Sequence, residues 1–292
     1  MPAVACLIAD PSRQPLDGKL VDEAARAVDG KVRWLAEAEA AEVATDLEPD
    51  AAATRLAALV AGQPLDLNLL PAEHRRKRLL LCDMDSTVIT IECIDELAGL
   101  AGIKPQIAAV TRRAMNGELD FAAALRERVG LLKGLDEAVI ARVIRDRITL
   151  MPGGRALVAT MRAHGAYAAL VSGGFTAFTG AIAGVMGFDE NRANTLLMSE
   201  GKLSGHVANP ILGRAAKVQA LEEISARLGV TPEAAIAVGD GANDLGMLGL
   251  AGMGVALHAK PSVQEECQVR VNHGDLTALL FLQGYTRDQF SE

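Results

Sequence analysis

The stretch LLLCDMDST, residues 79–87, decides how the rest of the chain is interpreted. Four apolar residues, 79–82, run directly into Asp83 and Asp85, which are separated by one residue. A short apolar run bounded by polar residues is typical of a buried strand in a parallel sheet. Ligands of open parallel sheets bind beyond the carboxyl ends of the strands, and two carboxylates there repel each other unless a cation compensates them. The stretch therefore predicts a metal site at the edge of a parallel sheet.

Composition limits the classes of protein that the chain can belong to. It has 292 residues, a net charge of -8, 50% hydrophobic residues and only 3% aromatic residues. These values indicate a folded globular protein of more than one domain with an aliphatic core. A pI near 5.3 argues against nucleic acid as a partner, because a phosphate backbone requires a basic face. The one basic run, residues 75–78, is expected to be a solvated linker.

The cysteines and the apolar segments bear on location. Cys6, Cys82, Cys93 and Cys267 show no C-x-x-C spacing, which favours buried, reduced thiols. The N-terminus lacks the charged region followed by an apolar region that is typical of a signal peptide. No apolar segment reaches membrane-spanning length. We therefore expect a cytoplasmic protein without a membrane partner.

Residues 1–75 are predicted to form a small N-terminal α+β domain. Strands are expected at 4–9, 31–35, 41–45 and 65–69, and helices at 16–28 and 50–61, with Asp50 as the N-cap of the second helix. This order resembles a ferredoxin-like βαββαβ unit. Pro71 and the charged segment through Arg78 mark the boundary.

Residues 76–292 are predicted to form a doubly wound α/β domain interrupted by a helical insertion. Four helices, at 94–100, 104–116, 120–129 and 137–148, make up an insertion at about 92–148, which is well placed to be a lid. The sheet resumes at 166–171 and is followed by a helix at 176–186 and a hairpin of strands at 193–198 and 202–207. A helix at 217–228 and strands at 235–238, 254–257 and 269–271 complete the alternation, which indicates a parallel sheet.

Polar groups follow the predicted strands at four points in the chain. They are Asp83 with Asp85, the run 172–174 (Ser-Gly-Gly), Lys217, and the run from Asp240 to Asp244. Taken singly, each has an ordinary explanation as a turn, a solvated side chain or a loop. Together, and in this order, they resemble the four motifs of the haloacid dehalogenase-like superfamily over residues 79–260. DMDST is similar to its first motif, VSGG at 171–174 to its second, Lys217 to its third and GDGAND at 239–244 to its fourth.

The resemblance implies a role for each matching residue. Asp83 would be the nucleophile that forms an aspartyl-phosphate, and Asp85 the general acid and base. A Mg²⁺ ion would be held by Asp83, the backbone carbonyl of Asp85 and Asp240. Asp244 would orient Lys217 or a metal-bound water. The substrate phosphate would be held by Ser172, Gly173, Lys217 and Asn243.

A narrower resemblance lies in the helical insertion. Glu92, Met115, Phe121 and Arg128 fall where phosphoserine phosphatases place the residues of their cap that recognise serine. By this resemblance the substrate is O-phosphoserine, and its hydrolysis to L-serine and phosphate would be the last step of L-serine biosynthesis. Glu92 would pair with the ammonium and Arg128 with the carboxylate, while Met115 and Phe121 would cover the site.

The predicted N-terminal domain also fits the resemblance to phosphoserine phosphatases. In some relatives of that family an N-terminal extension is an amino-acid-binding ACT domain, and residues 1–75 have the element order of one such unit. We expect an interaction or regulatory role, or a merely structural one, and a homodimer formed through this domain.

The sequence is also compatible with other functions. Within enzymes, the chain could act on another small phosphomonoester or transfer phosphate to an alcohol. From a different class, it could be a phospho-accepting signalling module, although such a module needs neither a cap nor the second acid, Asp85. A third reading is an amino-acid sensor with an inactive phosphatase half.

Overall fold

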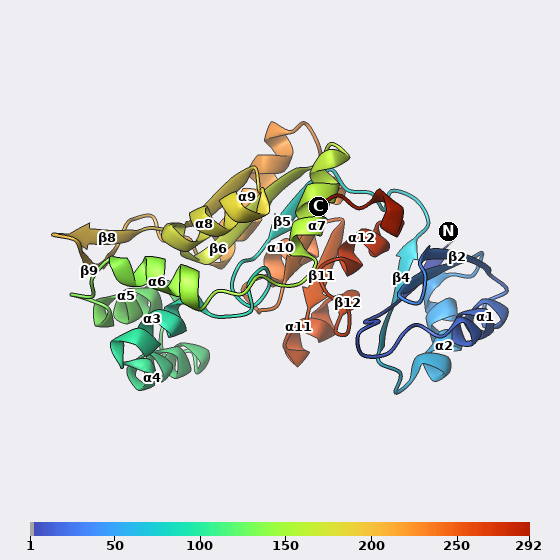
Figure 1. Cartoon of the computed structure of the whole chain (residues 1–292), viewed down its shortest axis with the longest axis horizontal. Coiled ribbons are helices and arrows are strands. Elements are labelled where there is room, and N and C mark those ends of the chain that lie inside the picture. Colours follow the sequence, from blue (N-terminus) through green and yellow to red (C-terminus); the bar gives the residue numbers. More distant parts are fainter. Residues whose placement is uncertain (1–2) are drawn as a thin grey trace.

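The computed structural model describes residues 3–292, and these form three parts in a row. The N-terminal domain lies at one end of the molecule, the helical cap at the other, and the main α/β domain between them (Figure 1). The chain enters the main domain once, between the end of the N-terminal sheet at Pro71 and the start of the next strand at Leu79.

The main domain is built on a sheet of six strands in the order β12-β11-β10-β5-β6-β7, and every neighbouring pair is parallel. Its central strand, β5, is fully buried, as its uninterrupted apolar sequence requires. The strands are β5 (Leu79–Cys82), β6 (Tyr167–Phe175), β7 (Glu190–Asn194), β10 (Ala235–Gly239), β11 (Met253–Leu257) and β12 (Val269–Val271).

Helices cover both faces of this sheet. Alternate residues of β5 belong to two apolar clusters: Leu79 and Leu81 contact one layer of helices, and Leu80 and Cys82 the other. The first layer contains α9 (Arg214–Arg227), α10 (Leu245–Leu250) and α11 (Pro261–Glu266). The second contains α7 (Gly154–Ala163), α8 (Thr176–Met186) and α12 (Ala278–Leu282). Short 3-10 turns lie at Pro232–Ala234 and Arg287–Gln289. The doubly wound prediction is therefore correct.

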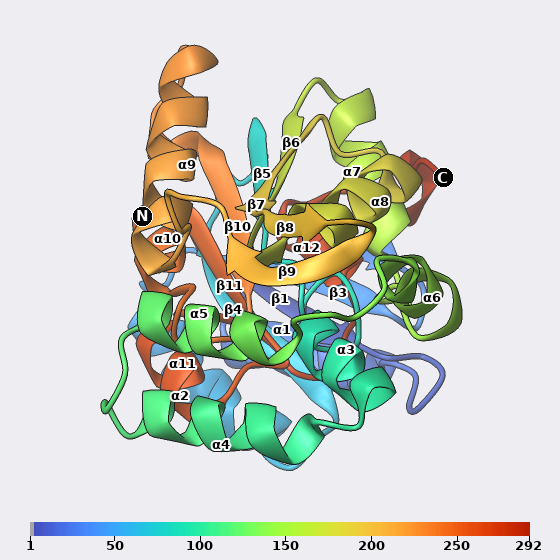
Figure 2. The same cartoon turned by 90° about the vertical axis from the view of Figure 1, so that its left-hand side faces the viewer.

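The cap follows β5 and consists of four helices, as the insertion at 92–148 predicts. They are α3 (Cys93–Ala101), α4 (Lys104–Met115), α5 (Phe121–Leu131) and α6 (Ala138–Asp146). A hairpin of β8 (Leu196–Ser199) and β9 (Lys202–Val207) lies against α5, as the view from the cap end shows (Figure 2). The segment 134–137 pairs with β9 and with Gly201 in the turn before it, through backbone hydrogen bonds of 2.8–2.9 Å, so the cap and the hairpin form one unit.

The N-terminal domain has the predicted βαββαβ order. Its antiparallel sheet has the strand order β2-β3-β1-β4, with α1 (Gly18–Ala27) and α2 (Pro49–Val60) packed on one face. The strands are β1 (Ala3–Ala9), β2 (Lys31–Ala36), β3 (Ala40–Thr45) and β4 (Leu65–Pro71). The prediction that Asp50 caps the second helix is wrong, because the helix begins one residue earlier with Pro49, and Asp50 lies inside its first turn.

The other face of the N-terminal sheet packs on the main domain. Val4, Cys6 and Ile8 of β1 share an apolar cluster with residues of α7 and α12. At the edge of the interface, Asn68 of β4 pairs with the backbone of Arg270 on β12, accepting from its N–H at 2.8 Å and donating to its carbonyl at 2.9 Å. A side-chain amide thus makes the two bonds that a neighbouring strand would make.

The expectation of a solvated linker at residues 75–78 is wrong. The guanidinium of Arg75 pairs with Glu42 of β3 at 2.7 Å and is only 10% exposed. The guanidinium of Arg76 lies 4.1 Å from the centre of the Tyr285 ring, and the backbone N–H of Lys77 donates to Gln283 at 3.0 Å. The basic run is therefore part of the domain interface, since the fold supplies an anion and an aromatic face that the linear sequence places far away.

Two further predictions need correction. The expected strand at 193–198 is two strands, because β7 ends in the parallel sheet at Asn194 and β8 begins the hairpin at Leu196. No element is predicted at 154–163, yet α7 lies there and buries Leu157, Val158 and Met161 at helical spacing. All four cysteines are free and buried, as expected. Among residues 3–292, no helix is long and apolar enough to cross a membrane.

Candidate active site

The site lies at the carboxyl ends of β5 and β10, which are neighbours in the sheet. Their register pairs Cys82 with Val238, and the backbone N–H of Asp83 donates to the carbonyl of Val238 at 3.0 Å. The chain then leaves both strands, which brings Asp83 and the Asp240–Asp244 loop to the same edge of the sheet. This is the juxtaposition that the polar residues after each strand predict.

A buried cation lies between two of these acids. Lys217 enters from the first turns of α9, and its ammonium is 2.5 Å from a carboxylate oxygen of Asp83 and 2.5 Å from one of Asp244. All three side chains are buried. Burial alone would lower the pKa of Lys217, but the charges of Asp83 and Asp244 outweigh it and raise that pKa. Lys217 is therefore a fixed positive charge at the site.

The position of Asp244 depends on a glycine. A Cβ at Gly239 would lie 2.4 Å from the carboxylate carbon of Asp244, so only glycine leaves room for it. The backbone N–H of Gly241 donates to the second oxygen of Asp244 at 3.0 Å. This explains why a glycine-rich loop carries the acids here.

The acids outnumber the cation. Oxygen atoms of Asp83, Asp240 and Asp244 all lie within 4.8 Å of one another, while Lys217 is a buried cation that contacts Asp83 and Asp244. Burial raises the pKa of Asp83, and Lys217 opposes that shift. A cluster of hard carboxylate oxygens with an excess of negative charge has the donor set of a divalent cation site. The predicted ligands Asp83 and Asp240 belong to this cluster. Asp244, which is predicted to orient Lys217 or a metal-bound water, also lies close enough to bind an ion there.

Asp240 has two further contacts. The hydroxyl of Thr87, the last residue of the DMDST stretch, donates to its carboxylate at 3.5 Å. The backbone N–H of Lys260 donates to its carbonyl at 3.3 Å. Burial, followed by the charge of Asp244, raises the pKa of Asp240 to about 6.

Asp85 lies beside residues 172–174, near the carboxyl end of β6. One of its oxygens accepts the backbone N–H of Cys93 at 2.9 Å, at the start of the cap. A Cβ at Gly174 would be 2.9 Å from the other oxygen and 3.1 Å from the hydroxyl oxygen of Ser172. Burial, followed by the charge of Glu92, raises the pKa of Asp85 to about 6. A carboxyl with a raised pKa beside a polar loop can donate a proton near neutral pH.

The predicted phosphate-holding groups come from three elements. Ser172 is buried, and its hydroxyl accepts the backbone N–H of Gly174 at 2.8 Å. Gly173 lies against the ring of the cap residue Phe121. Asn243 precedes Asp244, and its amide lies 3.5 Å from an oxygen of that residue. The structure thus brings Ser172, Lys217 and Asn243 around the acid cluster.

Three of the four predicted cap residues lie at the site. Glu92 accepts a hydrogen bond from Ser86 at 3.0 Å, and it is near enough to Asp85 and Asp240 to raise the pKa of both. Burial lowers the pKa of Arg128, and the charges of Asp95 and Glu92 oppose this shift, so Arg128 lies near Glu92.

The two apolar cap residues differ in position. A Cβ on Gly173 would be 3.2 Å from the tip of the Phe121 ring, and one on Gly213 would be 2.9 Å from its side, so the ring rests on both glycines. Met115 is 78% exposed, so it does not cover the site in this structure. It is the last residue of α4, whose buried positions are Ile107 and Val110.

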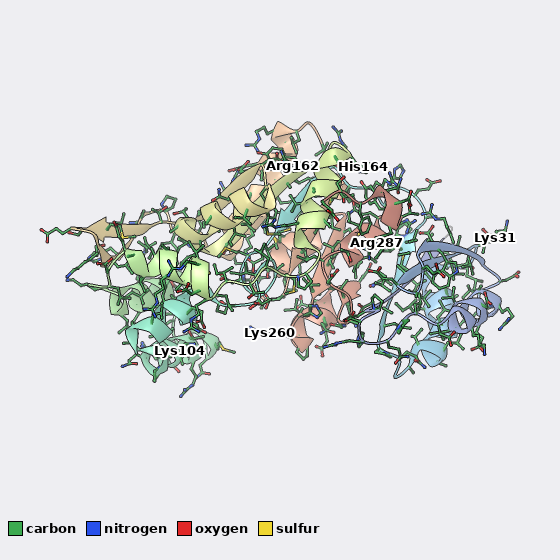
Figure 3. The ribbon with its side chains drawn as sticks, in the orientation of Figure 1. Lys31, Lys104, Arg162, His164, Lys260 and Arg287 are labelled. Carbon is green, nitrogen blue, oxygen red and sulfur yellow. The ribbon has the colours of Figure 1, made fainter. Side chains whose placement is uncertain are left out.

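Lys260 is a residue at the site that the sequence analysis does not single out. It follows β11, the strand next to β10, by three residues. In the side-chain view it lies between Lys104 of the cap and Lys31 of the N-terminal domain (Figure 3). The sequence contains a signal for Lys260, because the rule that identifies Asp83 makes any polar residue after a strand of a parallel sheet a candidate site residue.

The fold, the acid cluster at the strand ends and the buried lysine define a class of protein. Residues 80–249 match the haloacid dehalogenase-like hydrolase family, more than half of the chain, and the protein belongs to that family.

Its relatives within the family carry a more particular name. The chain is 42% identical over 245 residues to a phosphoserine phosphatase of Streptomyces coelicolor, covering 83% of this chain and 60% of that protein. It is 46% identical over 210 residues to a phosphoserine phosphatase of Polaromonas, covering 70% of this chain and 89% of that protein.

Solved structures of similar proteins cover nearly the whole fold. The crystal structure of a probable phosphoserine phosphatase from Vibrio cholerae, in its unliganded form, superposes with a TM-score of 0.81 and 32% identity, over 97% of this chain and 86% of that one. The likeness therefore includes the N-terminal domain.

Proposed function

We propose that this protein hydrolyses O-phospho-L-serine to L-serine and phosphate. The observation that carries the proposal is the convergence of Asp83, Asp85 and Lys217 beside the cap residue Glu92, with Arg128 of the cap near Glu92. The likeness to phosphoserine phosphatases of other organisms supports the same substrate.

The first half of the reaction would use the two aspartates of the DMDST stretch. One oxygen of Asp83 is held by Lys217, and the other attacks the phosphorus atom. The bond between phosphorus and the seryl oxygen breaks as Asp85 gives its proton to that oxygen, and L-serine leaves. A carboxyl whose pKa is raised to about 6 suits the acid role.

The second half would restore the enzyme. Water attacks the phosphorus atom of the aspartyl-phosphate and gives a proton to Asp85, and the bond between phosphorus and Asp83 breaks. Ser172 and Lys217 would hold the phosphoryl oxygens in both halves, because catalysis of phosphoryl transfer is mainly positioning and charge stabilisation. Asn243 and the backbone of Gly173 would add hydrogen bonds from the other sides.

Mg²⁺ is the cation that we infer for the acid cluster. Asp83 and Asp240 would hold the ion, and the backbone carbonyl of Asp85 would be a further oxygen donor. Asp244 would not bind the ion but would orient Lys217, which it contacts. When bound, the ion would supply the positive charge that the phosphate and the clustered carboxylates lack. The chemistry of the donor set and its excess negative charge support this assignment.

Selection of phosphoserine would depend on the cap. The carboxylate of Glu92 can pair with the substrate ammonium, and the guanidinium of Arg128 can bind its carboxylate with two parallel hydrogen bonds. Phe121 would close the site against water from its place over Gly173. Met115 could contribute only after α4 moves inward.

The test is phosphate release from L-phosphoserine with and without Mg²⁺, run beside Asp83→Asn. We expect turnover that needs the cation and is abolished by the substitution. Arg128→Ala should raise KM for phosphoserine far more than KM for p-nitrophenyl phosphate, which has no amino-acid part. Arg126→Ala is the matched control, because Arg126 is an exposed residue of the same helix. Equal effects of Arg128→Ala on both substrates would remove the amino-acid assignment.

The setting of the reaction is also a proposal. A phosphatase of this specificity would complete L-serine biosynthesis, and four buried free thiols suit the cytoplasm. A homodimer through the N-terminal domain, and binding of an amino acid there, are further expectations. Size-exclusion chromatography with light scattering would test the first, and serine titration by calorimetry the second.

A further inference from the structure

The loop that carries Ser172 and Gly173 interrupts the regular pairing of β6 with β7. Val171 pairs with Arg192 and Phe175 with Asn194, so four residues advance on β6 while two advance on β7. The two extra residues form a bulge in β6 between Val171 and Phe175. The bulge also leaves backbone groups of the loop without partners on the neighbouring strand.

Asn194 supplies one of the missing partners. It is the last residue of β7 and is 2% exposed. Its amide nitrogen donates to the carbonyl of Gly173 at 2.9 Å and to the carbonyl of Leu212 at 3.0 Å. Its amide oxygen accepts the N–H of Leu212 at 2.8 Å. Both amide hydrogens and the oxygen are therefore used.

The two segments that Asn194 joins belong to different parts of the site. Gly173 is next to Ser172, and Leu212 immediately precedes Gly213, the N-cap of α9. Four residues further along that helix is Lys217, which contacts Asp83. One buried amide thus connects the backbone beside Ser172 to the segment that leads to Lys217, the two groups that would hold the phosphate.

The same bond also shapes the surface on which the cap rests. The ring of Phe121 contacts Gly173 and Gly213, the residues on either side of the Asn194 bridge. If the bridge opened, the two glycines would separate and the ring would lose its support. Asn194 itself lies beneath the loop and makes no hydrogen bond to any of the acids among the described residues.

The geometry points to Asn194 as a positioning residue for phosphate, which clamps the Ser172–Gly173 loop to the segment that leads to Lys217. The inference rests on the proposed function only in taking phosphate as the group bound at Ser172 and Lys217. It predicts that Asn194 governs affinity for phosphate and leaves affinity for the metal unchanged, because Asp83 and Asp240 directly follow β5 and β10 and do not belong to the clamped segments.

The first test is Asn194→Asp, which has the same shape but places a carboxylate oxygen against two carbonyl oxygens. Binding of inorganic phosphate to the Mg²⁺-loaded protein is measured by calorimetry, and binding of Mg²⁺ alone is measured in the same way. We expect the Kd for phosphate to rise about tenfold or more, since two buried carbonyls lose their donors. The Kd for Mg²⁺ should stay within about twofold of the unaltered protein, a margin well below one tenfold step.

Asn68→Asp is the matched control. Asn68 is equally buried and makes the same amide bridge to a backbone N–H and carbonyl, but it does so at the domain interface. The Asn68→Asp variant should be less stable than the unaltered protein but should bind phosphate with the same affinity. If Asn194→Asp does not fold, Asn194→Ser, whose hydroxyl keeps one donor, is measured by the same criteria.

The outcomes separate the possibilities. An unchanged Kd for phosphate in the Asn194 variant would overturn the inference, and so would an equal loss of phosphate and Mg²⁺ binding, because a merely structural residue would affect both. If the unaltered protein binds phosphate but does not hydrolyse phosphoserine, the proposed function fails while the role of Asn194 is still decided by these measurements.

Discussion

We expect the substitution Gly213→Ala to lower activity, although it adds only one methyl group. Its backbone does not require glycine, because its φ is −108°, a value that alanine adopts freely. The added Cβ of Gly213→Ala would, however, lie 2.9 Å from the Cδ1 atom of Phe121 and 3.5 Å from two further ring atoms. The substitution therefore acts on the cap and not on the backbone.

The size of the effect follows from this contact. Carbon atoms pack at about 3.5–4.0 Å, so the ring of Phe121 must retreat by roughly 0.6 Å or more. Overpacking of this kind costs about 1–3 kcal/mol. If that cost applies to the arrangement in which Phe121 covers the site, kcat/KM for phosphoserine should fall about 5-fold to about 160-fold.

The assay is steady-state phosphate release in a double-mutant cycle with Phe121→Ala. With the ring removed, the new methyl group loses its three closest contacts, so Gly213→Ala should have little further effect in that background. Gly184→Ala is the matched control, because a Cβ at this position of α8 has no atom within 4 Å. Equal losses from Gly213→Ala with and without the ring would refute the reasoning.

Three further predictions concern stability. Asp66 is buried and accepts the N–H groups of residues 272–274 at 2.7–3.0 Å; Asp66→Asn should lower the free energy of unfolding in urea by roughly 2–5 kcal/mol, whereas the exposed Asp22→Asn should not. Although burial alone would raise it, hydrogen bonds from Arg227 and Arg192 hold the pKa of Glu190 below its ordinary value. The stability from Glu190 is then complete above the unfolded pKa of about 4.3 and is lost as pH falls through the lower folded value, so Glu190→Gln should flatten the acid limb of a stability-against-pH curve; an unchanged limb would contradict this. Mg²⁺ at about 100 times its Kd should stabilise the fold by about 2.7 kcal/mol, seen as a rise in Tm that EDTA reverses and that Asp240→Asn abolishes; a Tm indifferent to Mg²⁺ would count against the metal site.

The sequence by itself determined the parts of this protein that depend on local pattern. The apolar run before Asp83 predicts β5, and the same rule applied to later strands places the Asp240–Asp244 loop at the same sheet edge. The order of strands and helices in residues 1–75 gave the ferredoxin-like unit, because turns and helical spacing are local signals. Lys217 could be chosen from its place after the second motif, by resemblance.

Only the tertiary structure decided which residues support that site and how the domains meet. Arg75 appears solvated in sequence because its partner Glu42 is 33 residues away. Asn194 appears to be an interior strand residue, and its role exists only because β6 bulges beside it and the segment at Leu212 folds back. Met115 matches a recognition position in the linear pattern, yet the orientation of α4 leaves it exposed. The physical reason is common to all three: burial and hydrogen bonding depend on partners distant in the chain, and no local pattern encodes those partners.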